Sequence, residues 1–148
     1  MARDLEERGF ETYLPLVTEI HRWSDRRKAV EVPLFSGYTF ARLTATPADL
    51  LHVKRIPGVV SIVGAKPAGT PIQAEQIESV RILLAGKYPY ENYPFLKLGQ
   101  RVRICNGSLR GIEGILAACK GENKLVVSIE LIQRSLAITL DNYDIEPA

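Results

Sequence analysis

Apolar and polar residues alternate over much of the first third of the chain, as they do in half-buried β-strands. Residues 10–17 and 30–43 carry this alternation, broken at Pro15 and Gly37, and a polar stretch over residues 21–28 separates them. Pro and Gly interrupt strands, and polar clusters mark turns. The pattern therefore predicts an antiparallel sheet whose strands are joined by a charged hairpin tip.

The pattern then changes to helical periodicity in separate segments. Residues 2–8 are charged and rich in helix formers, which predicts a short helix. Residues 46–55 and 70–86 each begin with a Thr-Pro pair, a helix N-cap followed by proline in the first turn, and each ends at Gly or just before Pro-Gly. Between them, the apolar run at residues 59–63 predicts a short buried strand.

Beyond residue 94 the apolar runs are short, and Gly and Asn turns separate them. The strands predicted from these runs are residues 102–105, 112–119, 125–131, 136–140 and 143–145. Short strands at such regular spacing are typical of a small barrel. The Tyr- and Pro-rich segment 87–94 precedes them and is the predicted linker, because its prolines disfavour helix and favour extended backbone.

Composition narrows the class of protein. The chain has 148 residues, 46% of them apolar and 24% charged, with a net charge of +2, so we expect a packed fold whose contacts with nucleic acid are local. Its two cysteines are too few for a disulfide scaffold, and neither a signal peptide nor a spanning apolar stretch is evident. We therefore expect a cytoplasmic protein that does not enter a membrane.

The sequence offers no set of residues suited to catalysis. His21 and His52 lie in different predicted elements and belong to no HxH or HExxH motif. The Gly-rich stretch near residue 107 lacks the Gly-Lys-Ser/Thr ending of a phosphate-binding loop. Cys105 and Cys119 are expected to be small strand residues. The chain is therefore expected not to be an enzyme and to hold no metal or cofactor.

The charged hairpin tip is the candidate nucleic-acid site. Its residues are Arg22, Trp23, Arg26, Arg27 and Lys28. Cations meet phosphates, and an indole can stack on an unpaired base, as in single-strand binding. The alternative is a solvated turn whose indole folds against its own sheet.

Two segments, taken in order, resemble a known family. Residues 33–43, PLFSGYTFARL, resemble the signature of the NusG N-terminal (NGN) domain, and residues 99–116, GQRVRICNGSLRGIEGIL, resemble a KOW motif. The resemblance implies an α+β fold: an NGN-type antiparallel sheet with flanking helices, followed by a small SH3-like five-stranded KOW β-barrel. The corresponding domains are residues 1–86 and 95–148, joined by the linker 87–94.

The resemblance also implies a transcription elongation or antitermination factor that grips the clamp helices of the largest RNA polymerase subunit. Phe35 and Tyr38 match the motif positions that line the binding surface, and Leu34 and Phe40 flank them. Ser36 stands where the family commonly has Pro. The alternative for these aromatic residues is plain core packing. In the family, the face that corresponds to the charged tip lies beside upstream DNA and the displaced non-template strand.

The KOW-like half is expected to bind a second partner, in the family a small-subunit ribosomal protein or the Rho terminator. The residues proposed for this contact are Arg103, Leu109 and Arg110. Gly107, Gly111 and Gly114 could equally be hairpin glycines of any SH3-like barrel. Residues 124–137 resemble specialised paralogues of the UpxY and RfaH type more than housekeeping NusG.

One departure from the family pattern gives a further expectation. NGN domains begin with a strand of the Trp-Tyr-x-Leu type, and this sequence starts within the helix that follows it. We therefore expect reduced stability and self-association through an uncovered edge.

A ribosome-associated RNA-binding KOW protein is the alternative function, although such proteins usually carry a larger basic excess. A truncated, inactive relative is the third possibility.

Overall fold

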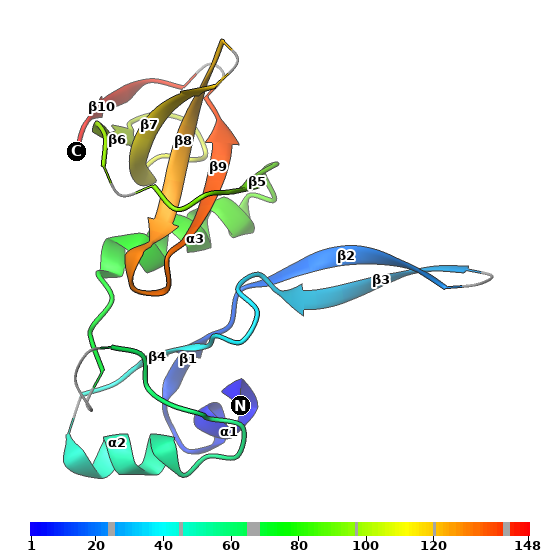
Figure 1. The fold of residues 1–148 in the computed structure, drawn as a ribbon, viewed down its shortest axis with the longest axis vertical. Coiled ribbons are helices and arrows are strands. Elements are labelled where there is room, and N and C mark those ends of the chain that lie inside the picture. Colours follow the sequence, from blue (N-terminus) through cyan, green and yellow to red (C-terminus); the bar gives the residue numbers. More distant parts are fainter. Residues whose placement is uncertain (24–25, 45, 65–68, 97, 120, 141–142) are drawn as a thin grey trace. The chain divides into compact units, whose positions relative to one another are not determined.

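The computed structural model describes residues 1–148 except 24–25, 45, 65–68, 97, 120 and 141–142. Contacts within the chain divide it into two compact units, Met1–Thr70 and Pro71–Ala148, and each is described by itself. The first unit combines short helices with two-stranded ribbons, and the second combines one longer helix with a six-stranded antiparallel sheet (Figure 1). The predicted α+β class is confirmed.

The helices of the first unit are α1 (Ala2–Glu7) and α2 (Pro47–Lys54). The Thr46 hydroxyl accepts a 3.2 Å hydrogen bond from the Asp49 backbone N–H, so the predicted N-cap of α2 is confirmed. Buried apolar residues from both helices and from the α2 exit form the core of this unit. They are Leu5, Val53 and Ile56, with Phe10, Leu43, Val59 and Ile62 packed against them.

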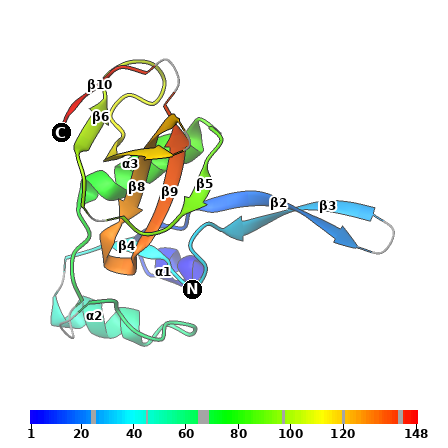
Figure 2. The same cartoon turned by 45° about the horizontal axis from the view of Figure 1, so that its top comes forward.

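Among the described residues of the first unit, the strands form two ribbons and not one continuous sheet. Strand β1 (Glu11–Tyr13) pairs with β4 (Phe40–Arg42), and β2 (Leu16–Trp23) pairs with β3 (Arg26–Pro33). The β2–β3 hairpin extends away from α1 and α2 in both ribbon views (Figures 1 and 2). Its strands continue through most of the predicted polar tip, because the ladder pairs every residue from Leu16 to Trp23.

The prediction of a buried strand at residues 59–63 is wrong. The segment has no strand structure, and Val60 is 99% exposed. Val59 and Ile62 pack against the core, but no described strand of this unit pairs with the segment. A strand needs a neighbour to share its backbone hydrogen bonds, so an apolar run without one stays irregular.

The second unit is built on a sheet with the strand order β10-β6-β7-β8-β9-β5, in which every neighbouring pair is antiparallel. Its strands are β5 (Glu91–Tyr93), β6 (Arg101–Ile104), β7 (Glu113–Cys119), β8 (Glu122–Ile129), β9 (Arg134–Thr139) and β10 (Ile145–Pro147), with the 3-10 turn η1 (Glu130–Ile132) between β8 and β9. Five of these strands lie at or beside the predicted positions.

The sheet is not a closed barrel. Strands β10 and β5 lie at its two edges and do not pair with each other. Strand β5 comes from the predicted linker and pairs with β9, where Asn92 lies opposite Leu136. The second unit is therefore β-rich as expected, whereas the predicted SH3-like five-stranded barrel is not confirmed.

Helix α3 (Ala74–Ala85) belongs to the second compact unit and packs against β7 and β8. The compact units therefore divide at residues 70 and 71, earlier than the predicted linker at 87–94. The helical period at 70–86 correctly predicts a helix, but its predicted start at the Thr70-Pro71 pair is wrong, because the N-cap is Gln73 and the helix begins at Ala74. Periodicity also does not say which sheet the apolar face of the helix meets. As a division into independently folding domains, the predicted boundary stays a prediction.

Close packing fixes the centre of the second unit. The described core residues of the sheet include Val102, Ile104, Leu125, Ile129 and Leu136, each at most 1% exposed. A Cβ atom added to Gly114 would lie 2.4 Å from the Val126 carbonyl oxygen on the neighbouring strand. Position 114 therefore requires glycine because β7 and β8 approach too closely for any side chain.

Candidate interaction surfaces

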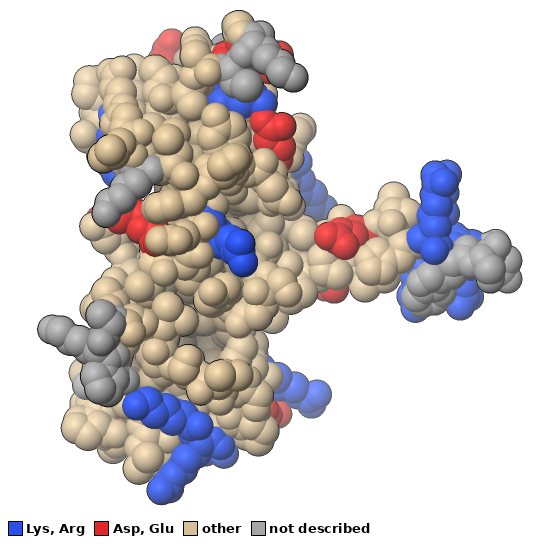
Figure 3. Space-filling model, in the orientation of Figure 1, with Lys and Arg blue, Asp and Glu red and all other residues tan. Residues whose placement is uncertain are grey.

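The far end of the β2–β3 hairpin gathers positive charge. The register places Arg22 directly opposite Arg27, and Lys28 is the next residue of β3. Arg22, Arg27 and Lys28 are exposed, and Lys and Arg side chains crowd this end of the hairpin in Figure 3. Like charges directly opposite one another destabilise a ladder. An anion bound between them would offset that repulsion, so this end is suited to phosphate.

The predicted nucleic-acid residues are therefore brought together by strand pairing. Arg26 is also exposed and lies opposite Trp23 in the register. The side chain of Trp23 lies outside what the structure describes, as do residues 24–25 between the strands. The hypothesis that this indole stacks on a base stays a prediction.

Apolar residues continue the surface along the hairpin. Leu16 and Ile20 are 42% and 67% exposed. Side chains alternate along a strand, so these residues share the face of β2 that carries Arg22. The exposed face of the ribbon is therefore apolar near its base and cationic near its end. Sequence alternation predicts which residues of β2 share this face, whereas the structure is needed to show which residues of β3 lie opposite them.

An aromatic cluster lies beside the β1–β4 ribbon. The Tyr13 and Phe40 rings stack with centroids 6.4 Å apart, and the Phe35 ring meets Phe40 edge-on at 6.2 Å. Phe35 is only 5% exposed, whereas Leu34 and Tyr38 are half-buried. Phe35 is thus a core residue that supports the surface, and Tyr13 is a cluster member that the sequence analysis missed.

A tight turn positions this cluster. The Tyr38 N–H donates a 3.1 Å hydrogen bond to the Phe35 carbonyl oxygen, and Gly37 has a φ of 87°. A positive φ at the third turn position is the requirement of a type II turn, which favours proline at the second position. Ser36 occupies that second position, so the turn keeps its glycine and lacks the usual proline.

The residues predicted to bind a second partner have different environments. Leu109 is buried at 2% exposure, and Arg110 is exposed. Arg103 donates hydrogen bonds of 2.8 and 2.5 Å to the Glu113 carboxylate, and lies 3.5 Å from Glu146. The hydrogen bond to Glu113 and the negative charge of the Glu113 carboxylate both raise the pKa of Arg103. Among these residues, Arg110 is the one whose position best suits contact with a partner.

Tyrosine hydroxyl groups lie beside the loop that follows β6, residues 105–112. Tyr88 and Ser108 share a hydrogen bond between their hydroxyl groups. Burial raises the pKa of Tyr143, and its hydrogen bond with Tyr88 raises it further. The Asn106 side chain donates to the Asp144 carboxylate, 3.1 Å away, and accepts from the Asp144 N–H. These bonds hold the loop after β6 against the chain before β10.

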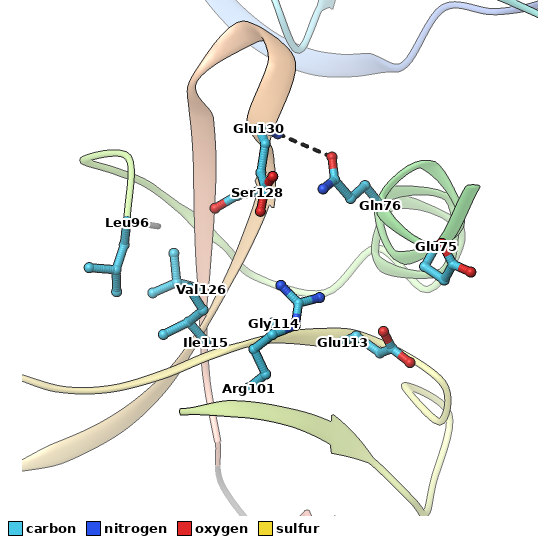
Figure 4. Close-up of a pocket in the computed structure, with 10 residues that line it drawn as sticks. All are labelled: Glu75, Gln76, Leu96, Arg101, Glu113, Gly114, Ile115, Val126, Ser128 and Glu130. Carbon is cyan, nitrogen blue, oxygen red and sulfur yellow. Dashed lines mark hydrogen bonds between the residues drawn. The ribbon is translucent and has the colours of Figure 1, made fainter. Parts of the chain in front are cut away.

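A small hollow beside α3 is lined by both polar and apolar residues (Figure 4). Glu75, Glu113 and Glu130 contribute carboxylates, and Arg101 contributes a cation. Among the described residues, no group of three or more His, Cys, Asp or Glu side chains could hold a metal ion. Within that same part of the chain, no helix is long and apolar enough to cross a membrane.

Comparison with known proteins assigns the family. The family model described as "NusG: Transcription termination factor nusG" matches residues 1–81, more than half of the chain. The chain belongs to the NusG family. No curated protein matches it. Membership of the NusG family identifies it as a NusG-like transcription factor, and the matched region contains both the β2–β3 hairpin and the aromatic cluster.

Proposed function

We propose that this NusG-family chain is a transcription elongation or antitermination factor that acts in the cytoplasm by binding, without bond chemistry. The observation that carries the proposal is the family match over residues 1–81. The first unit binds the clamp helices of the largest RNA polymerase subunit. The second unit acts as a KOW-type module of a specialised UpxY- or RfaH-like factor, and its partner is a small-subunit ribosomal protein or Rho.

The polymerase contact in this proposal is made by the half-buried residues of the aromatic cluster. Leu34, Tyr38 and Phe40 each keep part of their surface exposed, while the buried Phe35 ring packs edge-on against Phe40. Aromatic residues that combine a rigid apolar body with partial exposure are the usual anchors of protein interfaces. The proposed site is therefore an apolar surface of modest size.

A pull-down with purified bacterial RNA polymerase tests this contact. The variant Leu34→Ala/Tyr38→Ala removes exposed anchor surface and leaves Phe35 in place. We expect affinity to fall at least about tenfold, the scale of an interface anchor. Leu51→Ala is the matched control, since Leu51 is 47% exposed on α2. Unchanged binding of the double variant, or equal loss in the control, would contradict the proposed contact.

The cationic end of the hairpin is proposed to bind the phosphates of upstream DNA or of the displaced non-template strand. The support is the pairing of Arg22 with Arg27 on one exposed face. Each phosphate contact on a single strand contributes about −0.7 to the slope of log affinity against log salt concentration. Arg22→Gln/Arg27→Gln should therefore reduce the magnitude of that slope by about 1.4.

Titration of the full chain with single-stranded DNA at several salt concentrations measures this slope. Arg42→Gln is the control, because Arg42 is an exposed arginine of β4 in the same unit. An unaltered slope in the double variant would exclude the hairpin as the phosphate site. Tight, salt-sensitive binding to RNA without any binding to polymerase would instead support the ribosome-associated alternative.

A further inference from the structure

The outer edge of strand β2 has no partner strand among the residues that the structure describes. Strands β2 and β3 form a ribbon of their own, in which β2 pairs with β3 alone. An edge strand presents a row of backbone N–H and C=O groups with which a further strand can pair. Isolated two-stranded ribbons are marginally stable in water, so an added strand would stabilise this one.

Proline limits the other long or buried sheet edges of the chain. In the second unit, Pro94 follows edge strand β5 directly, and Pro147 ends edge strand β10. In the first unit, β3 ends at Pro33. Proline cannot donate to a ladder, so these edges resist extension. Strand β2 is 8 residues long and contains no proline, which makes it the described edge best suited to accept another strand.

Charge is distributed unevenly along the β2–β3 hairpin. Glu19 and Glu31 are exposed and lie nearer its base, whereas Arg22, Arg27 and Lys28 are exposed at its far end. Figure 3 shows the same order, with acidic side chains on the hairpin before its cationic end. Two hairpins that lie antiparallel, edge to edge, bring the acidic part of each beside the basic part of the other. The hairpin is therefore complementary in charge to a second copy of itself.

Strand geometry decides how two copies of β2 can pair. Backbone N–H and C=O groups point alternately to the two sides of a strand, so a symmetric antiparallel pair places one residue opposite its own copy. Glu19 or Ile20 at the centre gives the longest ladder within Leu16–Trp23. A ladder centred on Glu19 sets two carboxylates face to face, which destabilises it. A ladder centred on Ile20 instead places Glu19 opposite His21 of the second copy, so this register is favoured.

The side chains at this centre are available for contact. Ile20 is 67% exposed, and its own copy would cover it, since directly opposite Cβ atoms lie about 4.5–5.5 Å apart. The Glu19 and His21 side chains are 58% and 42% exposed, and the His21 Nε2 atom lies 3.2 Å from a Glu19 carboxylate oxygen. Both therefore lie on one face of β2. In the symmetric pair, acid and base alternate around the two strands.

We propose that this chain forms a symmetric dimer in which the outer edges of β2 from two copies pair antiparallel about Ile20, making a four-stranded sheet of the two hairpins. This inference goes beyond the proposed transcription function and does not rest on it. The outer edge of β3 is the weaker candidate. Its ladder would pair Arg27 with Glu31 of the second copy about Ala29, whose side chain is too small to give an apolar centre.

Sedimentation equilibrium of the full chain at rising concentration tests the dimer. We expect the wild-type chain to show a reversible equilibrium between monomer and dimer. Glu19→Lys and His21→Glu should each weaken dimerisation at least about tenfold, because the two-fold symmetry repeats every altered pair. An equimolar mixture of these two variants should dimerise again, since the introduced lysine then faces the introduced glutamate. Glu11→Lys is the matched control, with the same charge change at an exposed position of β1.

Each other result of sedimentation would overturn the proposal. A wild-type chain that stays monomeric at every concentration would do so directly. A dimer that neither variant weakens, or that does not return when the two variants are mixed, would show that Glu19 and His21 do not face each other across it. Weakening by Arg27→Glu alone would place the contact on the β3 edge instead.

The register is tested on the unmodified chain. A mixture of ¹³C-labelled and unlabelled chains gives nuclear Overhauser effects between different molecules. We expect such effects between Ile20 of one chain and Ile20 of the other. None should join Thr18 to its own copy, because four residues separate them along the paired strands, about 14 Å. Contacts between the two copies of Thr18 in place of those between the two copies of Ile20 would refute the register.

Discussion

Replacement of Phe35 by alanine should destabilise the first unit strongly. Phe35 is 5% exposed, and its ring meets Phe40 edge-on. Truncating a buried phenylalanine to alanine costs about 3–5 kcal/mol, of which the aromatic pair accounts for about 0.5–1.5 kcal/mol. The first unit spans Met1–Thr70. At roughly 0.05–0.15 kcal/mol per residue, its total stability is about 3.5–10 kcal/mol, so this single change removes a large share.

Urea unfolding followed by NMR measures the effect separately in each unit. The amide of Val53, in the core of the first unit, and that of Val127, in β8, serve as probes. We expect the midpoint to fall for Val53 alone. Ser36→Ala is the matched control, because Ser36 is exposed beside Phe35 and surface changes of this kind stay within about 0.5 kcal/mol.

The size of the loss decides how Phe35 acts. A loss below about 1 kcal/mol would refute the reasoning, since it would mean that the ring is not part of the packed core. It would also return Phe35 to the set of residues free to touch a partner. A loss near the expected value means that weaker polymerase binding by Phe35→Ala reports unfolding, which is why the proposed binding test leaves Phe35 unchanged.

Three further substitutions test individual features. Ser36→Pro fills the second position of the turn at Gly37 and should raise stability by about 0.4–1 kcal/mol, seen as a higher melting temperature; a lower one would contradict the type II turn. Gly114→Ala brings a Cβ against the Val126 carbonyl and should cost about 3 kcal/mol in urea unfolding, so a neutral result would contradict the close approach of β7 and β8. Arg103→Gln removes the contacts of Arg103 with Glu113 and Glu146. In amide hydrogen-exchange measurements, β10 amides should then exchange faster while β8 amides keep their rates. Unchanged exchange of the β10 amides would show that Arg103 does not secure this edge of the sheet.

Local sequence signals predicted the elements of this fold well. The Thr46 cap, the Gly37 turn and the alternating runs of the second half all specify structure through bonds or steric limits within a few residues. Such signals do not depend on what lies across the fold. They therefore remain valid whichever elements later pack together.

Features that depend on distant partners were not predictable in the same way. The strand expected at residues 59–63 does not form, because no described strand of its unit pairs with it. The expected barrel is not confirmed, because β5 and β10 remain separate edges of the sheet. The ion pairs of Arg103 likewise depend on strand pairing, since Glu113 lies opposite it on β7 and Glu146 lies opposite it on β10. An apolar run or a cation in the sequence shows which kind of contact its residues can make, whereas the topology of the fold determines which partner they meet.

The cationic end of the β2–β3 hairpin was predictable from the sequence only in part. The predicted charged end of a hairpin is present in the structure, while its role as a binding site stays a prediction, and a list of cations gives no geometry. The register adds the decisive step by placing Arg22 directly opposite Arg27, on the same face as Ile20. Like charges at directly opposite positions destabilise a ladder, so this pairing costs stability in the free chain. If the destabilising Arg22–Arg27 pair is kept because it binds DNA, Arg22→Gln should stabilise the free hairpin and weaken its affinity for DNA. A variant that loses both stability and affinity would refute this account.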